Sequence, residues 1–87
     1  MKFEFDNKKS ASNKAKHGLD FLQAQDLWKD KHLVTFPLSY VTEERFIAIG
    51  KIQNKSYSAI FTCRNKKIRL ISVRRSKKEE VNLYENH

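Results

Sequence analysis

Residues 44–75 most constrain the fold of this chain, because they hold apolar, β-branched stretches separated only by short polar connections. The stretches are ERFIAIGKI, SYSAIFTCR and KIRLISVRR, with IQNKS and NKK at their junctions. Runs of this composition joined by a few turn residues are typical of β-hairpins. We therefore expect an antiparallel sheet in this part of the chain.

A short strand and a polar helix are predicted at the N-terminus. Phe3 and Phe5 alternate with polar residues, which is the period of a strand. Asp6 or Asn7 can then cap a helix, and Gly18 is a natural stop just past it.

A second helix is predicted after Asp20, where DFLQ has the spacing of a capping box. Its apolar residues recur at helical intervals and are expected to pack on the core: Phe21, Ala24, Leu27 and Trp28. Residues 32–41 have the composition of a strand, which Pro37 restricts to an edge or an irregular strand. At the C-terminus, Ser76 and Glu79 are expected to cap a short helix.

These elements predict an α+β fold, with two N-terminal helices packed on a twisted antiparallel sheet and a short C-terminal helix. The chain has 87 residues, so residues 1–87 are expected to form a single domain.

The charge of the chain favours polyanionic partners. The net charge is +8, and residues 62–78 contain eight Lys or Arg and no acid. A membrane surface is disfavoured, because the sequence has no long apolar run and no basic amphipathic helix. The N-terminal residues lack the apolar segment of a signal peptide and there is one cysteine, so we expect a cytoplasmic protein.

The last predicted strand carries arginines on both faces. Strict alternation places Ile68, Leu70, Ser72 and Arg74 on one face, and Arg69, Ile71, Val73 and Arg75 on the other. Surface ion pairing accounts for any one of these arginines about as well as function does, with Glu43, Glu44, Glu79 or Glu80 as the partner. Arginine is also the better bidentate ligand for phosphate, which favours a phosphate-binding role for the group.

Two further segments carry candidate catalytic residues. Lys16 and His17 stand at a helix end, where His17 suits either general acid–base chemistry or a favourable position at the helix C-terminus. Glu44 and Arg45 open a strand, and Glu44 is either a base or a turn residue. The sequence has no glycine-rich phosphate loop, and its histidines show no metal-ligand spacing with Cys63, so we expect neither a metal nor a cofactor.

Three segments resemble the BrnT family of bacterial ribonuclease toxins: FDNKKSASNKAKHG, EERFIAIG and IRLISVRRSKKEEVNLYE. The residues that carry the resemblance are Asp6, Lys9, Asn13, Lys16, His17, Gly18, Glu44, Arg45, Gly50, Arg69, Ile71, Ser72, Arg74, Arg75, Glu80 and Tyr84. The chain departs from the family at Phe5, where Trp is common, and at Ser76, where Ala is common.

The resemblance implies a fold similar to the RelE and ParE toxins and RNA cleavage without a metal ion, which blocks translation. It also implies a cognate antitoxin with a ribbon-helix-helix DNA-binding domain, through which the complex binds operator DNA. In such a cleavage the ribose 2′-OH attacks the adjacent phosphate. The step needs a base, cations around the phosphorane and a proton for the leaving oxygen.

The resemblance and this chemistry assign roles to the candidates. Phosphate clamping and charge stabilisation are expected from Arg64, Arg69, Arg74 and Arg75. The base is His17 or Glu44, and the proton donor is Lys16 or His17. Further RNA contacts are expected from Lys9, Arg45, Lys66, Lys67 and Tyr84.

The alternative function is a basic module that binds RNA or DNA without cutting it. A nuclease and a pure binding module would both lose affinity for nucleic acid as the salt concentration rises. Only the formation of a cleaved product therefore distinguishes them. The polar KHG segment and Glu44 favour the nuclease, since a pure binder needs neither.

Overall fold

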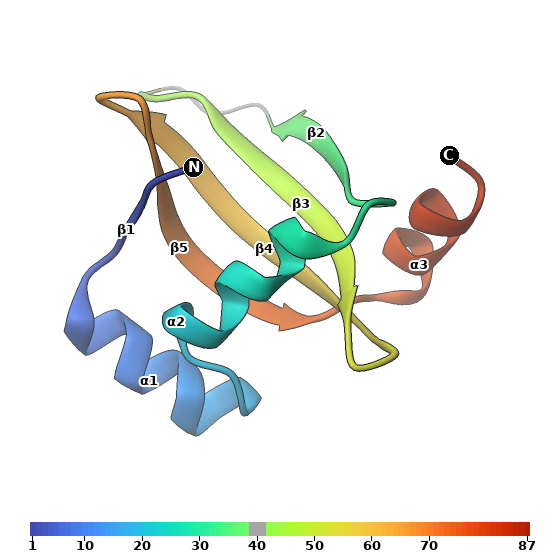
Figure 1. The fold of residues 1–87 in the computed structure, drawn as a ribbon, viewed down its shortest axis with the longest axis horizontal. Helices are drawn as coiled ribbons and strands as arrows, with labels where there is room; N and C mark the ends of the chain where they lie inside the picture. Colours follow the sequence, from blue (N-terminus) through green and yellow to red (C-terminus); the bar gives the residue numbers. More distant parts are fainter. Residues whose placement is uncertain (39–41) are drawn as a thin grey trace.

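The strands form one five-stranded sheet in the order β1-β5-β4-β3-β2 (Figure 1). The computed structural model describes residues 1–38 and 42–87. The elements are β1 (Phe3–Glu4), α1 (Asn7–His17), α2 (Phe21–Ala24), the 3-10 helix η1 (Gln25–Lys29), β2 (Val34–Leu38), β3 (Arg45–Ile52), β4 (Lys55–Arg64), β5 (Lys67–Arg75) and α3 (Lys78–Glu85).

The prediction of two N-terminal helices packed on a twisted antiparallel sheet is wrong. The sheet is mixed, because β1 runs parallel to β5, with Phe3 opposite Ile68 and Glu4 opposite Arg69. The second predicted helix has one α-helical segment of four residues, after which the chain continues as the 3-10 helix η1. A strand of two residues carries too little pattern to reveal its partner or its direction, which is why the sequence did not predict this pairing.

The long strands follow the predicted hairpins. β2, β3, β4 and β5 pair antiparallel in succession. The two-residue loops between β3 and β4 and between β4 and β5 have positive φ at both central positions, which are Gln53-Asn54 and Asn65-Lys66. Such loops match the right-handed twist of the strands that they join. The predicted strand over residues 32–41 is observed as β2 at the sheet edge, and its residues 39–41, Tyr40 among them, lie outside the described residues.

A β-bulge in β5 changes which arginines share a face. The register shifts at Ile60 and Phe61, which leaves Ile71 without a partner on β4. Alternate residues of β4 share one face, and so do their partners on β5: Thr62 with Arg69, Ile60 with Ser72, and Ser58 with Arg74. Arg69 and Arg74 therefore lie on the same face, whereas strict alternation predicted opposite faces.

Both faces of the sheet are packed. On the first face, α2, η1 and the strands enclose the larger core, made of Leu19, Phe21, Ala24, Leu27, Ala48, Ala59, Phe61, Leu70 and Val73, with Trp28 packed against it. On the second face, α3 contributes Tyr84 to a smaller cluster around Val34, Ile47 and Ile49. The prediction that the apolar residues of the DFLQ helix reach the core is confirmed.

The ends of the helices are fixed by side chains. Asp6 caps α1 by accepting hydrogen bonds from the backbone N–H groups of Lys8 and Lys9, at 2.8 and 3.1 Å. Gly18 ends α1 with a φ of 79°, a left-handed conformation that glycine adopts without strain. The C-terminal helix begins one residue later than predicted, because Glu80 rather than Glu79 accepts the N–H of Lys77, at 2.8 Å.

Candidate functional site

A shallow groove of about 210 Å³ lies between α1 and β5. We call it the α1–β5 groove, and its lining residues are Lys9, Ser12, Asn13, Lys16, His17, Ile71 and Ser72. The groove brings together three of the predicted residues, Lys9, Lys16 and His17, all of them exposed on α1. The bulge at Ile71 forms the opposite wall, consistent with the common occurrence of bulges beside active sites.

Asn13 fixes the distance between the two walls of this groove. Its side-chain amide donates to the carbonyl oxygens of Leu19 and Val73, both at 2.8 Å, and accepts from the N–H of Val73 at 3.1 Å. Asn13 is buried and thus bonds the edge of β5 as a neighbouring strand would. The helix that carries His17 is held against β5 by these bonds.

Three of the predicted arginines gather on the second face of the sheet. We call Arg45, Arg64 and Arg69 the arginine row. Arg69 lies opposite Thr62 on β4, and the Thr62 hydroxyl donates to the carbonyl oxygen of Glu44 at 2.6 Å, which places the start of β3 beside them. Lys66 and Lys67 extend the basic surface at the β4–β5 turn, where both are exposed.

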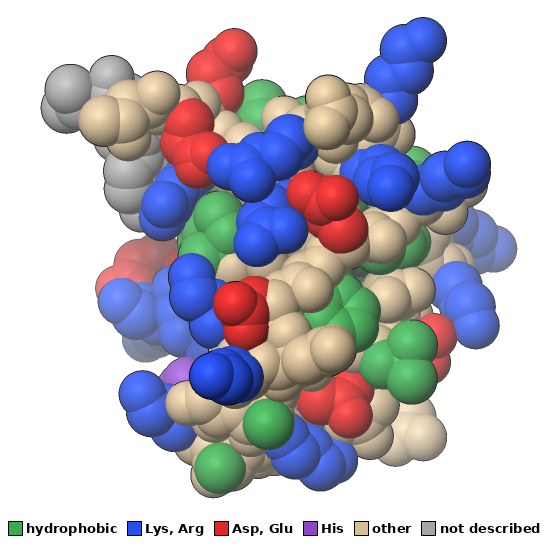
Figure 2. Space-filling model, turned by 90° about the vertical axis from the view of Figure 1, so that its left-hand side faces the viewer, with side chains coloured by type: hydrophobic (Ala, Val, Ile, Leu, Met, Phe, Trp, Pro, Cys, Tyr) green, Lys and Arg blue, Asp and Glu red, His purple; other side chains and the backbone are tan. Residues whose placement is uncertain are grey.

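Acidic side chains interleave with the arginine row. A Glu4 carboxylate oxygen lies 3.4 Å from Nη1 of Arg69. Glu43 lies between two arginines, at 3.6 Å from Nη2 of Arg64 and 4.0 Å from Nε of Arg45. In Figure 2, blue Lys and Arg side chains with red acids among them cover much of the face that the view presents.

Glu43 occupies the position among the arginines that Glu44 was expected to hold. The Glu44 side chain is exposed, and its backbone carbonyl accepts the Thr62 hydroxyl. Glu43 was one of the acids expected as surface partners of the arginines, and it lies beside Arg45 and Arg64. Glu4 was not predicted, because its contact with Arg69 depends on the parallel pairing of β1 with β5. Ser72 lines the groove next to the bulged residue Ile71. The sequence did not predict this position, because the bulge has no distinctive residue pattern.

The groove and the arginine row are continuous along β5. Backbone hydrogen bonds from Lys9 and Lys8 lower the pKa of Asp6, and the nearby charges of Lys9 and Arg69 lower it further. Arg69 lies opposite Glu4 of β1, two residues before Asp6, which caps α1. Ser72 lines the groove and shares a sheet face with Arg69.

Arg74 is on the same face but is bound by an acid of α3. Its guanidinium donates to both carboxylate oxygens of Glu80, at 2.7 and 2.8 Å. Glu80 also accepts the Ser58 hydroxyl at 2.9 Å. The hydrogen bonds from Arg74, with smaller contributions from Lys77 and Ser58, outweigh partial burial and lower the pKa of Glu80 to about 2. This geometry is that of a structural ion pair.

The structure separates two predicted residues from the others. Arg75 lies on the first face, with its guanidinium carbon 5.6 Å from the ring centre of Tyr57 and its Nε donating to the Ser56 carbonyl at 3.3 Å. Tyr84 lies on α3 and donates its hydroxyl to Asp30 at 2.6 Å. Burial and this hydrogen bond raise the pKa of Tyr84 to about 12.

The groove and the arginine row together offer an imidazole, ammonium groups, a serine hydroxyl and guanidinium groups. This set supplies proton transfer and stabilisation of an anion. Within residues 1–38 and 42–87, no three His, Cys, Asp or Glu side chains are grouped to hold a metal ion. No helix in the same residues is long and apolar enough to cross a membrane.

Comparison with known proteins identifies the family. A search of curated proteins finds no match. The family model described as the ribonuclease toxin BrnT of a type II toxin–antitoxin system matches residues 5–80. That match contains α1, the sheet from β2 to β5 and the acid that binds Arg74, so the chain belongs to the BrnT family of ribonuclease toxins.

Proposed function

We propose that this protein is a metal-independent endoribonuclease that cuts RNA in the α1–β5 groove and thereby blocks translation. The observation that carries the proposal is that His17 and Lys16 line one groove with Ser72. Ser72 and Arg69 lie on the same face of the sheet. A proton-transfer group and a fixed cation therefore lie on the same side of one strand.

The reaction we propose is attack of a ribose 2′-oxygen on the adjacent phosphorus. The O2′–P bond forms and the P–O5′ bond breaks, which leaves a 2′,3′-cyclic phosphate and a 5′-hydroxyl. A base accepts the proton of the 2′-OH, and an acid supplies a proton to the departing 5′-oxygen. We favour His17 over Glu44 as the base because His17 lines the groove, and we assign proton donation to Lys16.

The arginine row stabilises the charge that develops on the phosphorane. Arg64 and Arg69 each offer paired guanidinium N–H donors, whose planar geometry matches phosphate oxygens. Glu4 and Glu43 hold these guanidinium groups through partly exposed pairs, which are weak enough for a phosphate to replace. The acids thus orient the arginines.

Membership of a type II toxin–antitoxin family implies a cognate antitoxin. We propose that this antitoxin neutralises the toxin by covering the basic face, and that it carries a ribbon-helix-helix domain that binds operator DNA. Support comes from the net charge of +8, which an acidic segment of the antitoxin would complement.

The experiment is cleavage of labelled RNA by the purified protein in excess EDTA, with variants at the two groove residues. His17→Ala and Lys16→Ala are each expected to lower the cleavage rate by roughly a hundredfold, the scale of general acid–base catalysis. Lys55→Ala is the matched control, since Lys55 is exposed at the start of β4 and lies outside the groove.

Three results would contradict the proposal. They are no cleavage by folded wild type either alone or in a translating extract, loss of cleavage with EDTA, and full activity of His17→Ala. Tight RNA binding without any product would instead identify the non-catalytic binding module.

A further inference from the structure

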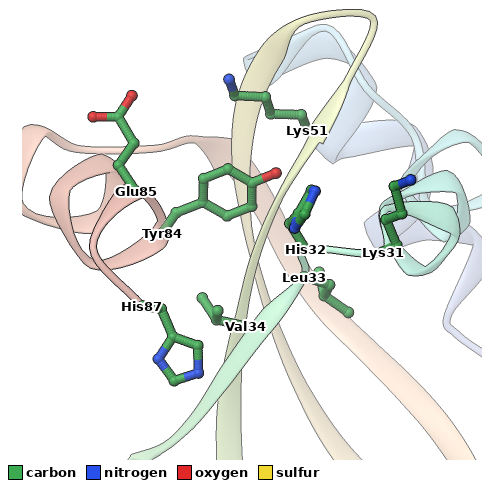
Figure 3. A pocket seen from close by; sticks show the side chains of 8 residues that line it. All are labelled: Lys31, His32, Leu33, Val34, Lys51, Tyr84, Glu85 and His87. Atoms are coloured by element: carbon green, nitrogen blue, oxygen red, sulfur yellow. The ribbon is translucent and has the colours of Figure 1, made fainter.

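A second pocket, of about 460 Å³, lies away from the groove, between α3 and the start of β2. It is lined by Lys31, His32, Leu33, Val34, Lys51, Tyr84, Glu85 and His87 (Figure 3). Its volume falls within the range of roughly 300–1,000 Å³ typical of small-molecule sites. The α1–β5 groove shares none of these residues.

Asp30 ties three walls of this pocket together. One carboxylate oxygen accepts the Tyr84 hydroxyl of α3 at 2.6 Å and the Lys51 N–H of β3 at 2.9 Å. The other accepts the N–H of His32 at 2.8 Å. Partial burial opposes ionisation of Asp30, but these donors outweigh it and lower the pKa of the carboxyl. Asp30 is thus occupied by the protein's own donors, and the walls are fixed before any ligand arrives.

Lys51 and His32 bring donor groups to the pocket. The Lys51 ammonium lies 5.7 Å from the ring centre of Tyr84, a cation–π contact that holds it at the mouth. Figure 3 shows His32 and Tyr84 pointing toward each other below Lys51, and Glu85 pointing away from the space between them. An ammonium and an imidazole that line one pocket favour an anion over a metal cation.

We propose that this pocket binds a phosphate group carried by a nucleotide. Lys51 and His32 contact the phosphate oxygens, and Lys31 adds positive charge at the rim. The pocket volume leaves room for the sugar or base beside the phosphate. This proposal does not depend on ribonuclease activity, because its residues lie outside the α1–β5 groove.

The test is an NMR titration of isotope-labelled protein with three probes: inorganic phosphate, adenosine monophosphate and a 2′-O-methyl RNA tetramer that cannot be cleaved. We expect saturable shifts of the amides of His32, Lys51 and Tyr84. Lys51→Ala and His32→Ala should each weaken binding roughly tenfold, since each removes a hydrogen-bond donor to the phosphate.

Two controls separate this site from the rest of the basic surface. Lys55→Ala and Lys78→Ala, at exposed lysines outside the pocket and the groove, should leave the affinity unchanged. Tighter binding of the monophosphate supports a site for free nucleotides, and tighter binding of the tetramer supports a site for an RNA chain. Absence of saturable shifts with all three probes, or equal weakening by Lys55→Ala, overturns the proposal.

Discussion

Asn13 shows how a polar residue can hold a helix in place. α1 has two apolar residues, Ala11 and Ala15, and both are exposed. Its buried residues are Ser10 and Asn13, and Ser10 accepts the N–H of Phe21 at 2.9 Å. The helix is therefore attached by hydrogen bonds to buried backbone groups, which would cost free energy if left unpaired.

Replacing Asn13 with Ala should lower the free energy of unfolding by about 3 kcal/mol, because three buried backbone bonds lose their partner. Urea denaturation measures the change. Ser12→Ala is the control on the same helix and should change stability by less than about 0.5 kcal/mol. If Asn13→Ala lowered the free energy of unfolding by no more than Ser12→Ala, the Asn13 amide would not be what anchors α1.

The family motif at the N-terminus divides into two groups at this scale. Asp6 and Gly18 cap α1, and Asn13 anchors it. Lys16 and His17 remain exposed in the groove. The residues of the first group have a structural role in placing α1. The residues of the second group are therefore the candidates for catalysis.

At the scale of elements, the link between β5 and α3 is the bidentate pair of Arg74 and Glu80. Glu80 is partly buried and also accepts from the N–H of Lys77 and the Ser58 hydroxyl. Its carboxyl is therefore ionised in the folded state down to a lower pH than in the unfolded chain. The pair fixes the first turn of α3 to the strand.

This link predicts an acid-dependent loss of stability. The pKa of Glu80 is about 2 in the folded protein against an ordinary value of 4.5, so its contribution is complete above pH 4.5 and disappears as pH falls toward 2. Glu80→Gln should lower the free energy of unfolding by about 2 kcal/mol at pH 7 and by much less at pH 2.

Denaturant unfolding of wild type and Glu80→Gln from pH 7 to pH 2 measures this difference. Glu79→Gln, an exposed acid on the same helix turn, is the control and should follow the wild-type pH dependence. A difference between wild type and Glu80→Gln that stays constant across this range would show that the Glu80 charge does not stabilise the fold.

Sequence reasoning succeeded where local chemistry decides the element. The hairpin loops, the cap at Asp6 and the stop at Gly18 each depend on a few adjacent residues, and all are observed. The predictions failed where contacts between residues far apart in the sequence determine strand pairing and register. The parallel pairing of β1 joins Phe3 to Ile68, and the bulge at Ile71 arises from register against β4.

The same division applies to the candidate site. The basic residues of α1 were predicted and lie in one groove, because a single helix sets their spacing. The faces of the arginines could not be predicted, because one bulged residue reverses the alternation beyond it. The contact of Glu4 with Arg69 could not be predicted either, because it depends on the pairing of β1 with β5.

At the scale of the molecule, the charge of +8 should make RNA binding strongly dependent on salt. Five cations line the groove or belong to the arginine row: Lys9, Lys16, Arg45, Arg64 and Arg69. The slope of log affinity against log salt should be about −3.5 if all five contact single-stranded RNA.

Fluorescence anisotropy with the His17→Ala variant, which we expect to bind without cleaving, measures this slope. Arg69→Ala in that background should make the slope less negative by about 0.7, the value for one phosphate contact. Lys55→Ala should leave it unchanged. Equal effects of the two substitutions would indicate diffuse attraction rather than a defined basic face.

The central claim is that RNA is cut on the face of β5 that carries Arg69. The direct test is the single-turnover rate of RNA cleavage by Arg69→Ala and Arg75→Ala, both confirmed folded by circular dichroism. The two arginines lie on one strand but on opposite faces of the sheet. We predict that the cleavage rate falls roughly a hundredfold for Arg69→Ala and less than about threefold for Arg75→Ala. Equal losses, or a larger loss for Arg75→Ala, would contradict this assignment of the catalytic face.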